Sequence, residues 1–313
     1  MEQKSNIKNV VNEFKSRDTY EVKHILVNPN GTIDRVIYEN DELFIKTPSM
    51  QHLEDSLNIR RLLSSKDEFK QLIERECGRF YFNFYDRGLL SMDIKESIKS
   101  RFLYLCTYTN YADKGMYLCF DNGKRMKRKD IAEILELSER EFKTTLKTML
   151  DNKLLTQDNE YFIVNKNIAI RGQLNGKQEA QAHTRVFDKG LRELYKNCKV
   201  SQHKQLYYLF RLLPYVNVKC NAICQNPSEQ NVNDVIVLKL KEICEVVGYD
   251  TTKSSRFLNE MLKLQLFDQY AILGIRNAKG TWYKINPRIV YAGTSGHLEE
   301  FKELLATDFS VNK

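Results

Sequence analysis

The sequence predicts a mainly helical α+β protein in which one helix–turn–helix unit occurs twice. The first observation is the stretch ILELSEREFKTTLKTMLDNKLL (134–155), where the end of one short helix is followed by a break and a second helix with a basic outer side. The second is a gapless copy of this stretch further along the chain. The third is an alternating apolar pattern around turn residues after each copy, which is typical of β-hairpins. Together these patterns predict two compact domains of the same kind.

Length and composition are those of a globular protein with a basic surface. A chain of 313 residues is long enough for two or three domains that each bury a core. Hydrophobic residues make up 42% and charged residues 29%, which excludes a disordered composition. The formal charge of +8 favours a polyanionic partner, but basic proteins without a nucleic-acid role have similar values.

The seven cysteines predict reduced core residues. Their number is odd, their spacing is irregular, and several lie in apolar runs such as FLYLCTYTNY (102–111). The first residues lack the charged-then-apolar pattern of a signal peptide, and the longest apolar runs are too short to span a membrane. We therefore expect a cytoplasmic protein with no membrane contact.

Residues 1–92 are predicted to form a small N-terminal α+β segment. Alternating β-branched residues flank Asn30-Gly31, which is a strong signal for a two-residue hairpin turn. The expected elements are strands near 20–28, 32–38 and 42–47, a helix over 51–76 and an aromatic strand over 78–85. No motif in this segment points to a particular chemistry.

Residues 93–173 predict a winged helix, which is a helix-turn-helix with an added β-ribbon. A helix begins near Ile94, a short strand follows in MYLCFDNG (116–123), and a short helix covers about 128–136. The capped helix comes next, and two strands around the turn Asp158-Asn159 complete the unit.

Ser138 and Glu141 mark the start of the capped helix. Ser-x-x-Glu is the pattern of a capping box, in which the two side chains satisfy each other's backbone N–H groups. The apolar residues then recur at helical spacing and predict one buried stripe: Phe142, Leu146, Met149 and Leu150. The opposite, solvent-facing side is mostly basic and hydroxylic.

The second copy lies 112 residues further on. Residues 130–155 align without a gap on 242–267, with identities such as Leu146 on Leu258 and Leu154 on Leu266. YFIVNKNIAIRG (161–172) then matches WYKINPRIVYAG (282–293), with a wing nine residues longer in the second copy. We therefore expect a second winged helix over 200–294, a linker helix over 174–199, and a C-terminal helix with a loose tail over 295–313.

Two such modules in one chain would bind one DNA duplex as a covalent dimer. A recognition helix reads base edges in the major groove, and the wing adds backbone contacts. In the first copy we predict base contacts from the outer face of the capped helix, by Arg140, Lys143, Thr144 and Lys147. The run KRMKRK predicts a phosphate clamp, made of Lys124, Arg125, Lys127, Arg128 and Lys129. The equivalent surface of the second copy holds Thr251, Thr252, Lys253, Ser255 and Arg256, and its wing tip holds Arg276, Asn277 and Lys279. The alternative is that these side chains are only solvated surface.

Nothing in the sequence predicts catalysis, a metal site or a cofactor. No two of the five histidines lie within two residues of each other, which excludes the His-x-His pair of a nicking enzyme. GQLNGKQ (172–178) lacks the spacing and the hydroxyl residue of a phosphate-binding loop. Cys220 and Cys224 have no second pair at zinc spacing, so core thiols are the better interpretation.

The chain resembles the winged-helix replication and regulatory proteins of plasmids and phages in low-GC Gram-positive bacteria. The resemblance covers about 94–293 and rests on RFLYLCTYTNY, YLCFDNGKRMKRKDIAEILELSEREF and INPRIVYAGT. It implies a replication initiator that binds repeats in double-stranded DNA at an origin and recruits host replication proteins, with no enzymatic step of its own. Two alternatives stay open: a transcriptional regulator of a mobile element, and a winged-helix protein-interaction module or an enzyme with an unrecognised site. The sequence also leaves a homodimer open.

Overall fold

The computed structural model describes residues 66–85, 89–277 and 280–311, together with three strands nearer the N-terminus. The chain divides into two compact units, Met1–Asp67 and Glu68–Lys313. The described part of the first unit is an antiparallel sheet in the order β1-β2-β3, formed by Val22–Val27, Ile33–Tyr38 and Ile45–Lys46. These strands confirm the three predicted from the sequence. The Asn30-Gly31 turn and residues 51–65 of the predicted helix lie outside the described residues.

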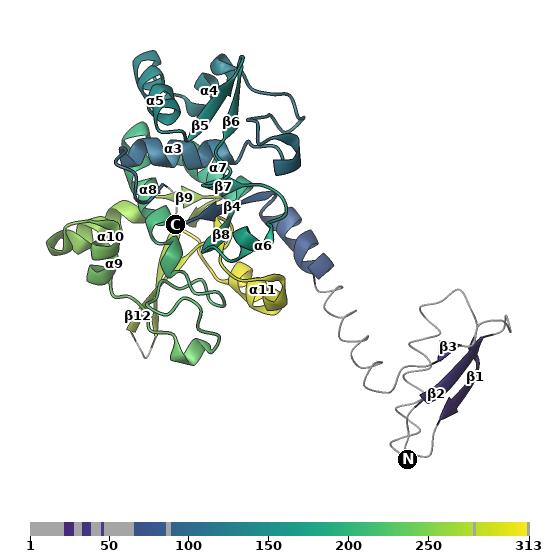
Figure 1. Ribbon diagram of the computed structural model, residues 1–313. Helices are drawn as coiled ribbons and strands as arrows, with labels where there is room; N and C mark the ends of the chain where they lie inside the picture. The colour runs from purple at the N-terminus through teal and green to yellow at the C-terminus, as the bar shows by residue number, and fades with distance from the viewer. Residues whose placement is uncertain are drawn as a thin grey trace. The chain divides into compact units, whose positions relative to one another are not determined.

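The second unit is α+β and is centred on a four-stranded antiparallel sheet. Its strand order is β13-β8-β4-β7, and its strands are Val290–Tyr291, His183–Phe187, Phe80–Phe84 and Ala169–Ile170. Figure 1 labels β8, β4 and β7 of this sheet. Aromatic residues on one face of this sheet pack against the helix over 66–76 and against α11 (Leu298–Ala306). The other face packs against α3 (Glu96–Cys106), where the Tyr81 hydroxyl donates to the Leu103 carbonyl at 2.9 Å.

The second unit contains two copies of one element order, which meet where α3 contacts α8 (His203–Arg211). The first copy consists of α3, α4, α5, β5 and β6, where the last four cover Arg128–Leu135, Glu139–Asp151, Leu155–Asp158 and Tyr161–Val164. The second consists of α8, α9, α10, β11 and β12, which cover His203–Arg211, Leu240–Val247, Ser254–Met261, Ile272–Asn277 and Gly280–Ile285. Figure 1 shows α4 and α5 at the top of the unit and α9 and α10 at its lower left.

Asn165 and Asn286 show that the two copies are related. In the first copy the Asn165 backbone N–H donates to the carbonyl of Leu154, and its side-chain amide donates to the carbonyl of Lys153. Asn286 makes the same two bonds, to Ala271 and Tyr270. The helix starts also agree, because the backbone N–H groups of Lys127 and Lys239 each donate to the acid three residues on. Equal hydrogen bonds at equal positions confirm the internal repeat.

The gapless alignment of the copies is wrong at its C-terminal end. The hydrogen bonds of Asn165 and Asn286 place Ala271, and not Leu266, at the position of Leu154. The reason is an additional hairpin in the second copy, made of β9 (Gln265–Leu266) and β10 (Gln269–Tyr270). The extra residues are therefore divided between this hairpin and the β11–β12 hairpin, and the β11–β12 hairpin is extended by less than the alignment predicted.

Segment 174–199 contains more than the expected linker helix. It forms a turn of helix, α6 (Gly176–Glu179), then β8 at the centre of the sheet, and then α7 (Asp188–Asn197). The strand was missed because HTRVF is short and its neighbours are polar, so it has no long alternating pattern. MYLCFDNG was predicted as a strand but forms only isolated bridges, among them Thr109 with Leu118.

The expected loose tail is also wrong for residues 307–311. Phe309 is fully buried, and its carbonyl accepts from the backbone N–H of Tyr270 at 2.8 Å. The Val311 N–H donates to the Asp268 carbonyl at 3.0 Å. The tail therefore pairs with the β9–β10 hairpin, which the sequence did not predict.

Two further predictions concern the chain as a whole. All seven cysteines are free, and all but the half-buried Cys198 are buried, in agreement with reduced core residues. In the described part of the chain, none of the helices combines the length and the apolar character needed to cross a bilayer.

Candidate nucleic-acid interface

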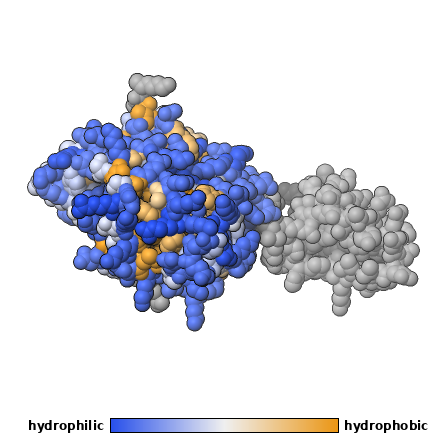
Figure 2. Space-filling view, turned by 90° about the horizontal axis from the view of Figure 1, so that it is seen from above, coloured by the Kyte–Doolittle hydropathy of each residue, from blue (hydrophilic) through white to orange (hydrophobic). Residues whose placement is uncertain are grey.

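The outer face of α5 carries the four residues predicted to contact bases. All of them are exposed: Arg140, Lys143, Thr144 and Lys147. The apolar side of the helix is buried against the core through Phe142, Leu146 and Met149. Figure 2, seen from the α4–α5 end, shows a mostly hydrophilic surface with a narrow strip of hydrophobic residues. The helix is thus oriented as predicted, while the role of these side chains in DNA binding stays a prediction.

Two of these residues have local partners on the helix itself. The Lys143 ammonium lies 2.6 Å from the Glu139 carboxylate, and both side chains are well exposed. Exposed pairs of this kind contribute little free energy, so Lys143 can exchange Glu139 for another anion at small cost. The Thr144 hydroxyl donates to the Arg140 carbonyl at 3.0 Å, which leaves its oxygen able to accept a hydrogen bond.

The start of α5 differs from the predicted capping box. Ser138 Oγ accepts from the Glu141 N–H at 3.3 Å, which is one half of the box. The Glu141 carboxylate, however, accepts from Arg101 of α3. Arg101 is almost fully buried, and it also donates to the Thr145 hydroxyl at 2.9 Å. A buried arginine therefore holds the candidate recognition helix against α3, because its guanidinium needs acceptors that the surrounding core does not supply.

The basic run that begins at Lys124 continues into the first turn of α4 and lies beside the β5–β6 hairpin. The Arg125 guanidinium stacks 3.7 Å above the Tyr117 ring, and the Lys127 ammonium lies 2.8 Å from the Glu160 carboxylate. Arg128 lies over the ring of Phe142 in α5, at 5.3 Å. Lys124 and Lys129 are exposed. The fold thus brings this run next to the candidate recognition helix.

An open pocket of about 380 Å³ separates α4 from the hairpin. It is lined by Lys127, Arg128, Lys129, Gln157, Asn159, Glu160 and Phe162. Cations at a helix N-terminus and amide donors on a facing turn suit a phosphate oxygen. Glu160 was not among the predicted residues, and its carboxylate reduces the positive charge of this pocket.

The equivalent surface of the second copy is less basic than predicted. Thr252, Lys253, Ser255 and Arg256 are exposed, and Thr251 is half-buried. Lys253 lies 2.8 Å from Asp250, and Arg256 lies 2.9 Å from Glu260, so each cation of the segment TTKSSR has an acid beside it. Hydrogen bonds from Lys253 and Thr252 lower the pKa of Asp250 to about 2, which keeps it charged at neutral pH.

The β11–β12 hairpin, which was predicted to be the wing of the second copy, is described only in part. Arg276 is exposed on β11. Asn277 ends that strand, and its side chain lies outside the described residues, as does all of Lys279. Arg276 therefore lies on the β11–β12 hairpin, and its predicted contact with DNA stays a prediction.

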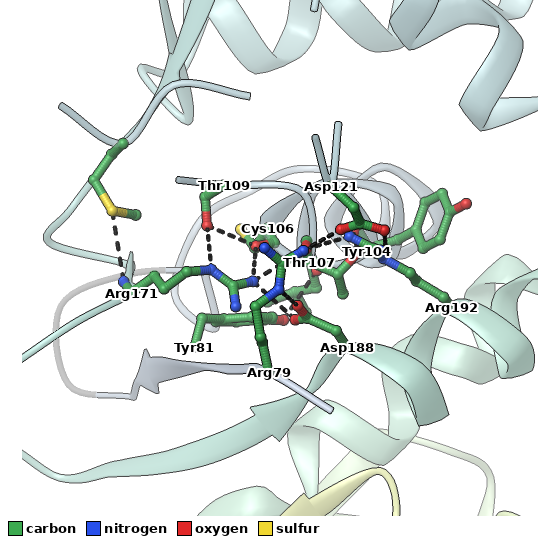
Figure 3. Close-up of polar contacts among 12 residues, drawn as sticks. Arg79, Tyr81, Tyr104, Cys106, Thr107, Thr109, Asp121, Arg171, Asp188 and Arg192 are labelled. Carbon is green, nitrogen blue, oxygen red and sulfur yellow. Dashed lines mark hydrogen bonds and ion pairs between the residues drawn. The ribbon is translucent and has the colours of Figure 1, made fainter. Parts of the chain in front are cut away.

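A buried network of arginines anchors the start of the basic run (Figure 3). Arg171 is 1% exposed and donates to Asp188 at 2.8 Å and to the Thr107 carbonyl at 3.0 Å. Arg192 donates to the same carbonyl at 2.7 Å and to Asp121 at 2.8 Å. Two guanidinium groups thus occupy the carbonyl end of α3, where the helix dipole favours positive charge.

Asp121 connects this network to the run that follows it. Burial raises the pKa of the Asp121 carboxyl, but the hydrogen bonds and charges of Arg192 and Arg79 lower it by more. The net pKa lies below its ordinary value, so the group is charged. Sequence reasoning missed Arg101, Arg171 and Arg192. The usable signal was an arginine inside an apolar helix, such as Arg101 in SRFLYLC, because a buried cation has to be paired.

Comparison with known proteins gives no relative for this fold and surface. A scan of protein-family models, a search of curated proteins and a search of solved structures each found no match.

Proposed function

We propose that this chain is a sequence-specific double-stranded DNA-binding protein built on two winged helices. Each copy has the element order of that fold, a helix followed by a helix pair and a β-hairpin. The single observation that carries the proposal is the α5 face, where four basic or hydroxyl side chains are exposed beside the basic run of α4. A helix with this surface fits the major groove, and flanking cations fit the adjacent phosphates.

We expect the two copies to contribute unequally to the affinity for DNA. In the first, the α5 face and the basic run lie together, with Arg128 packed on Phe142 between them. In the second, Asp250 and Glu260 accompany the exposed cations. We therefore assign most of the affinity to the first copy and a smaller share, through hydroxyl and wing contacts, to the second.

Among DNA-binding roles we favour a replication initiator of a plasmid or phage that binds repeats at an origin, with host replication proteins as further partners. This choice rests on the resemblance of residues 94–293 to such proteins and on the presence of two modules in one chain. A transcriptional regulator of a mobile element is the second candidate, because the same interface would serve it equally well.

Binding to DNA of the protein's own replicon separates these roles. The full-length protein is incubated with sheared replicon DNA at increasing salt, and the retained fragments are sequenced. We expect retention that falls steeply with salt, because phosphate contacts release counterions. Retained repeats at an origin support the initiator, and one promoter site supports the regulator. Equal recovery of all fragments at every salt concentration contradicts sequence-specific DNA binding as the function.

A further inference from the structure

The central sheet of the second unit is symmetric about the pair Phe82–Arg185. These two residues lie opposite each other where β4 pairs with β8. On the outer side of β4, Phe82 pairs with Ile170 of β7. On the outer side of β8, Arg185 pairs with Tyr291 of β13. β4 and β8 therefore each pair with the other and with one outer strand in the same register. In this symmetry β7 is equivalent to β13, and Phe82 is equivalent to Arg185.

The register between β4 and β8 shows which symmetry this is. With Phe82 equivalent to Arg185, the residues that flank them are equivalent too, so Tyr81 corresponds to Thr184 and Asn83 to Val186. Tyr81 pairs with Val186, and Asn83 pairs with Thr184. Exchanging the two strands turns one of these pairs into the other. A pattern that is unchanged by this exchange has a two-fold axis perpendicular to the sheet, between Phe82 and Arg185.

The helices that cover the sheet follow the same axis. The shift that carries Phe82 onto Arg185 also carries LY (103–104) of α3 onto LY (206–207) of α8. These two helices touch at Arg101 and His203, 3.1 Å apart. The same shift makes His203 the counterpart of residue 100. Two helices related by a two-fold axis cross where equivalent residues meet, and the contact between Arg101 and His203 lies within one residue of that point. The axis therefore leaves the sheet between α3 and α8.

The candidate recognition helices belong to this same side of the sheet. Arg101 of α3 holds α5 through Glu141 and Thr145. In the second copy, the ring of Tyr208 in α8 lies 5.8 Å from that of Phe257 in α10. The four exposed positions of α5 also have exposed counterparts in the second copy, at Thr252, Ser255, Arg256 and Asn259.

We propose that the two modules read one duplex site as two half-sites in opposite orientation. A two-fold axis relates the modules, and a DNA duplex has two-fold axes of its own, so coincident axes place the two helices on inverted half-sites. Modules related by a translation would read a direct repeat instead. The half-sites differ in sequence because the two reading faces differ. This inference rests on the proposed function and adds the arrangement of the DNA site.

Two variants that carry the same four exposed residues on both modules would show the relative orientation of the half-sites directly. One variant carries Thr252→Arg, Ser255→Lys, Arg256→Thr and Asn259→Lys, which copies the α5 face onto the second module. The matched variant carries Arg140→Thr, Lys143→Ser, Thr144→Arg and Lys147→Asn, which does the reverse. All eight positions are exposed, so both variants should fold. Sites are then selected from random-sequence duplexes with full-length wild type and both variants.

We expect each variant to select one half-site twice, in inverted orientation, and to bind it at least about tenfold more tightly than the direct repeat. Hydroxyl-radical footprints of the wild-type protein give a second reading that needs no variant. The protected positions on the two strands should lie at equal distances from one centre. Doubled half-sites in direct orientation, or footprints related by translation, overturn the inference and leave DNA binding intact. Failure of the wild-type protein to select any duplex overturns both proposals.

Discussion

The Arg101 Nε–H donates to Nδ1 of His203 at 3.1 Å, and this hydrogen bond joins the two copies of the repeated unit. Both residues are 2% exposed. The ring of His203 also stacks on Tyr195 of α7 at 4.5 Å. Because Nδ1 accepts a hydrogen bond, the imidazole has to be neutral. Burial, and secondarily the charge of Arg101, lower the pKa of His203 to about 4.

Acid should therefore destabilise the protein through His203. Its folded pKa lies below the ordinary histidine pKa of 6.5, so between these two pH values the unfolded chain binds more protons than the folded one. This contribution to the free energy of unfolding is complete above pH 6.5 and is lost as the pH falls towards 4. It amounts to at most about 3 kcal/mol. His203→Asn keeps an acceptor near Nδ1 but does not titrate.

Urea unfolding of wild type and His203→Asn between pH 7 and pH 4.5 measures this contribution. The wild type should be the more stable at pH 7, and its advantage should shrink by about 2 kcal/mol over this range. A constant difference between the two proteins at all pH values would show that His203 does not titrate in this way.

Arg101→Met should destabilise the protein by about 2–4 kcal/mol, because Thr145 and His203 lose a donor inside the core. Glu141 is partly exposed and can be solvated instead. The matched control is Arg75→Met, because the side chain of Arg75 is 72% exposed and pairs with Glu76. The control should change the free energy of unfolding by no more than about 1 kcal/mol. Similar losses in both variants would argue against a special role for Arg101.

Gly190 of α7 is required by a close approach of two backbone segments. A Cβ atom there would lie 2.0 Å from the Arg288 carbonyl oxygen, just before β13. Gly190→Ala should therefore cost about 1–3 kcal/mol or more, because backbone has to move. Gly176→Ala, where a Cβ meets nothing within 4 Å, should be neutral or slightly stabilising. Chemical denaturation compares the two, and equal stability of both variants contradicts the close packing of α7 on this turn.

Arg140→Ala or Lys143→Ala should lower the affinity for the selected DNA site by about 1–3 kcal/mol and relax the sequence preference. Lys70→Ala is the control, because Lys70 is exposed on the helix over 66–76, which packs on the opposite face of the sheet. Binding is measured by titration of fluorescent duplexes with and without the site. If the α5 variants bind like the wild type, α5 is not the reading helix.

Replacing Lys127, Arg128 and Lys129 by glutamine should weaken binding to every sequence alike. Each lost phosphate contact should reduce the slope of log affinity against log salt by about 0.9. Lys127 contributes least in our view, because its ammonium already pairs with Glu160. The control is the free energy of unfolding, which should stay within about 1 kcal/mol because these side chains are largely exposed. A loss restricted to one sequence would indicate base contacts rather than phosphate contacts.

The sequence alone determined the elements whose signals are local. Ser138 marks the start of α5, the period of Phe142, Leu146 and Met149 orients it, and Asp158-Asn159 marks the hairpin turn. The internal repeat was visible for the same reason, because equal core positions keep equal spacing. These features depend on residues a few positions apart, so they can be recognised without the fold.

Only the tertiary structure decided how the two copies are joined. β8 pairs with β4 and β13, each about a hundred residues away, and Arg101 meets His203 across a similar interval. Such contacts form between distant backbone groups and buried charges that still need a partner after the helices have packed. No short sequence pattern encodes which of these groups will meet. The extra hairpin at 265–270 and the anchored tail were hidden for the same reason. The symmetry of the second unit is therefore a property of its sheet register and not of any one segment.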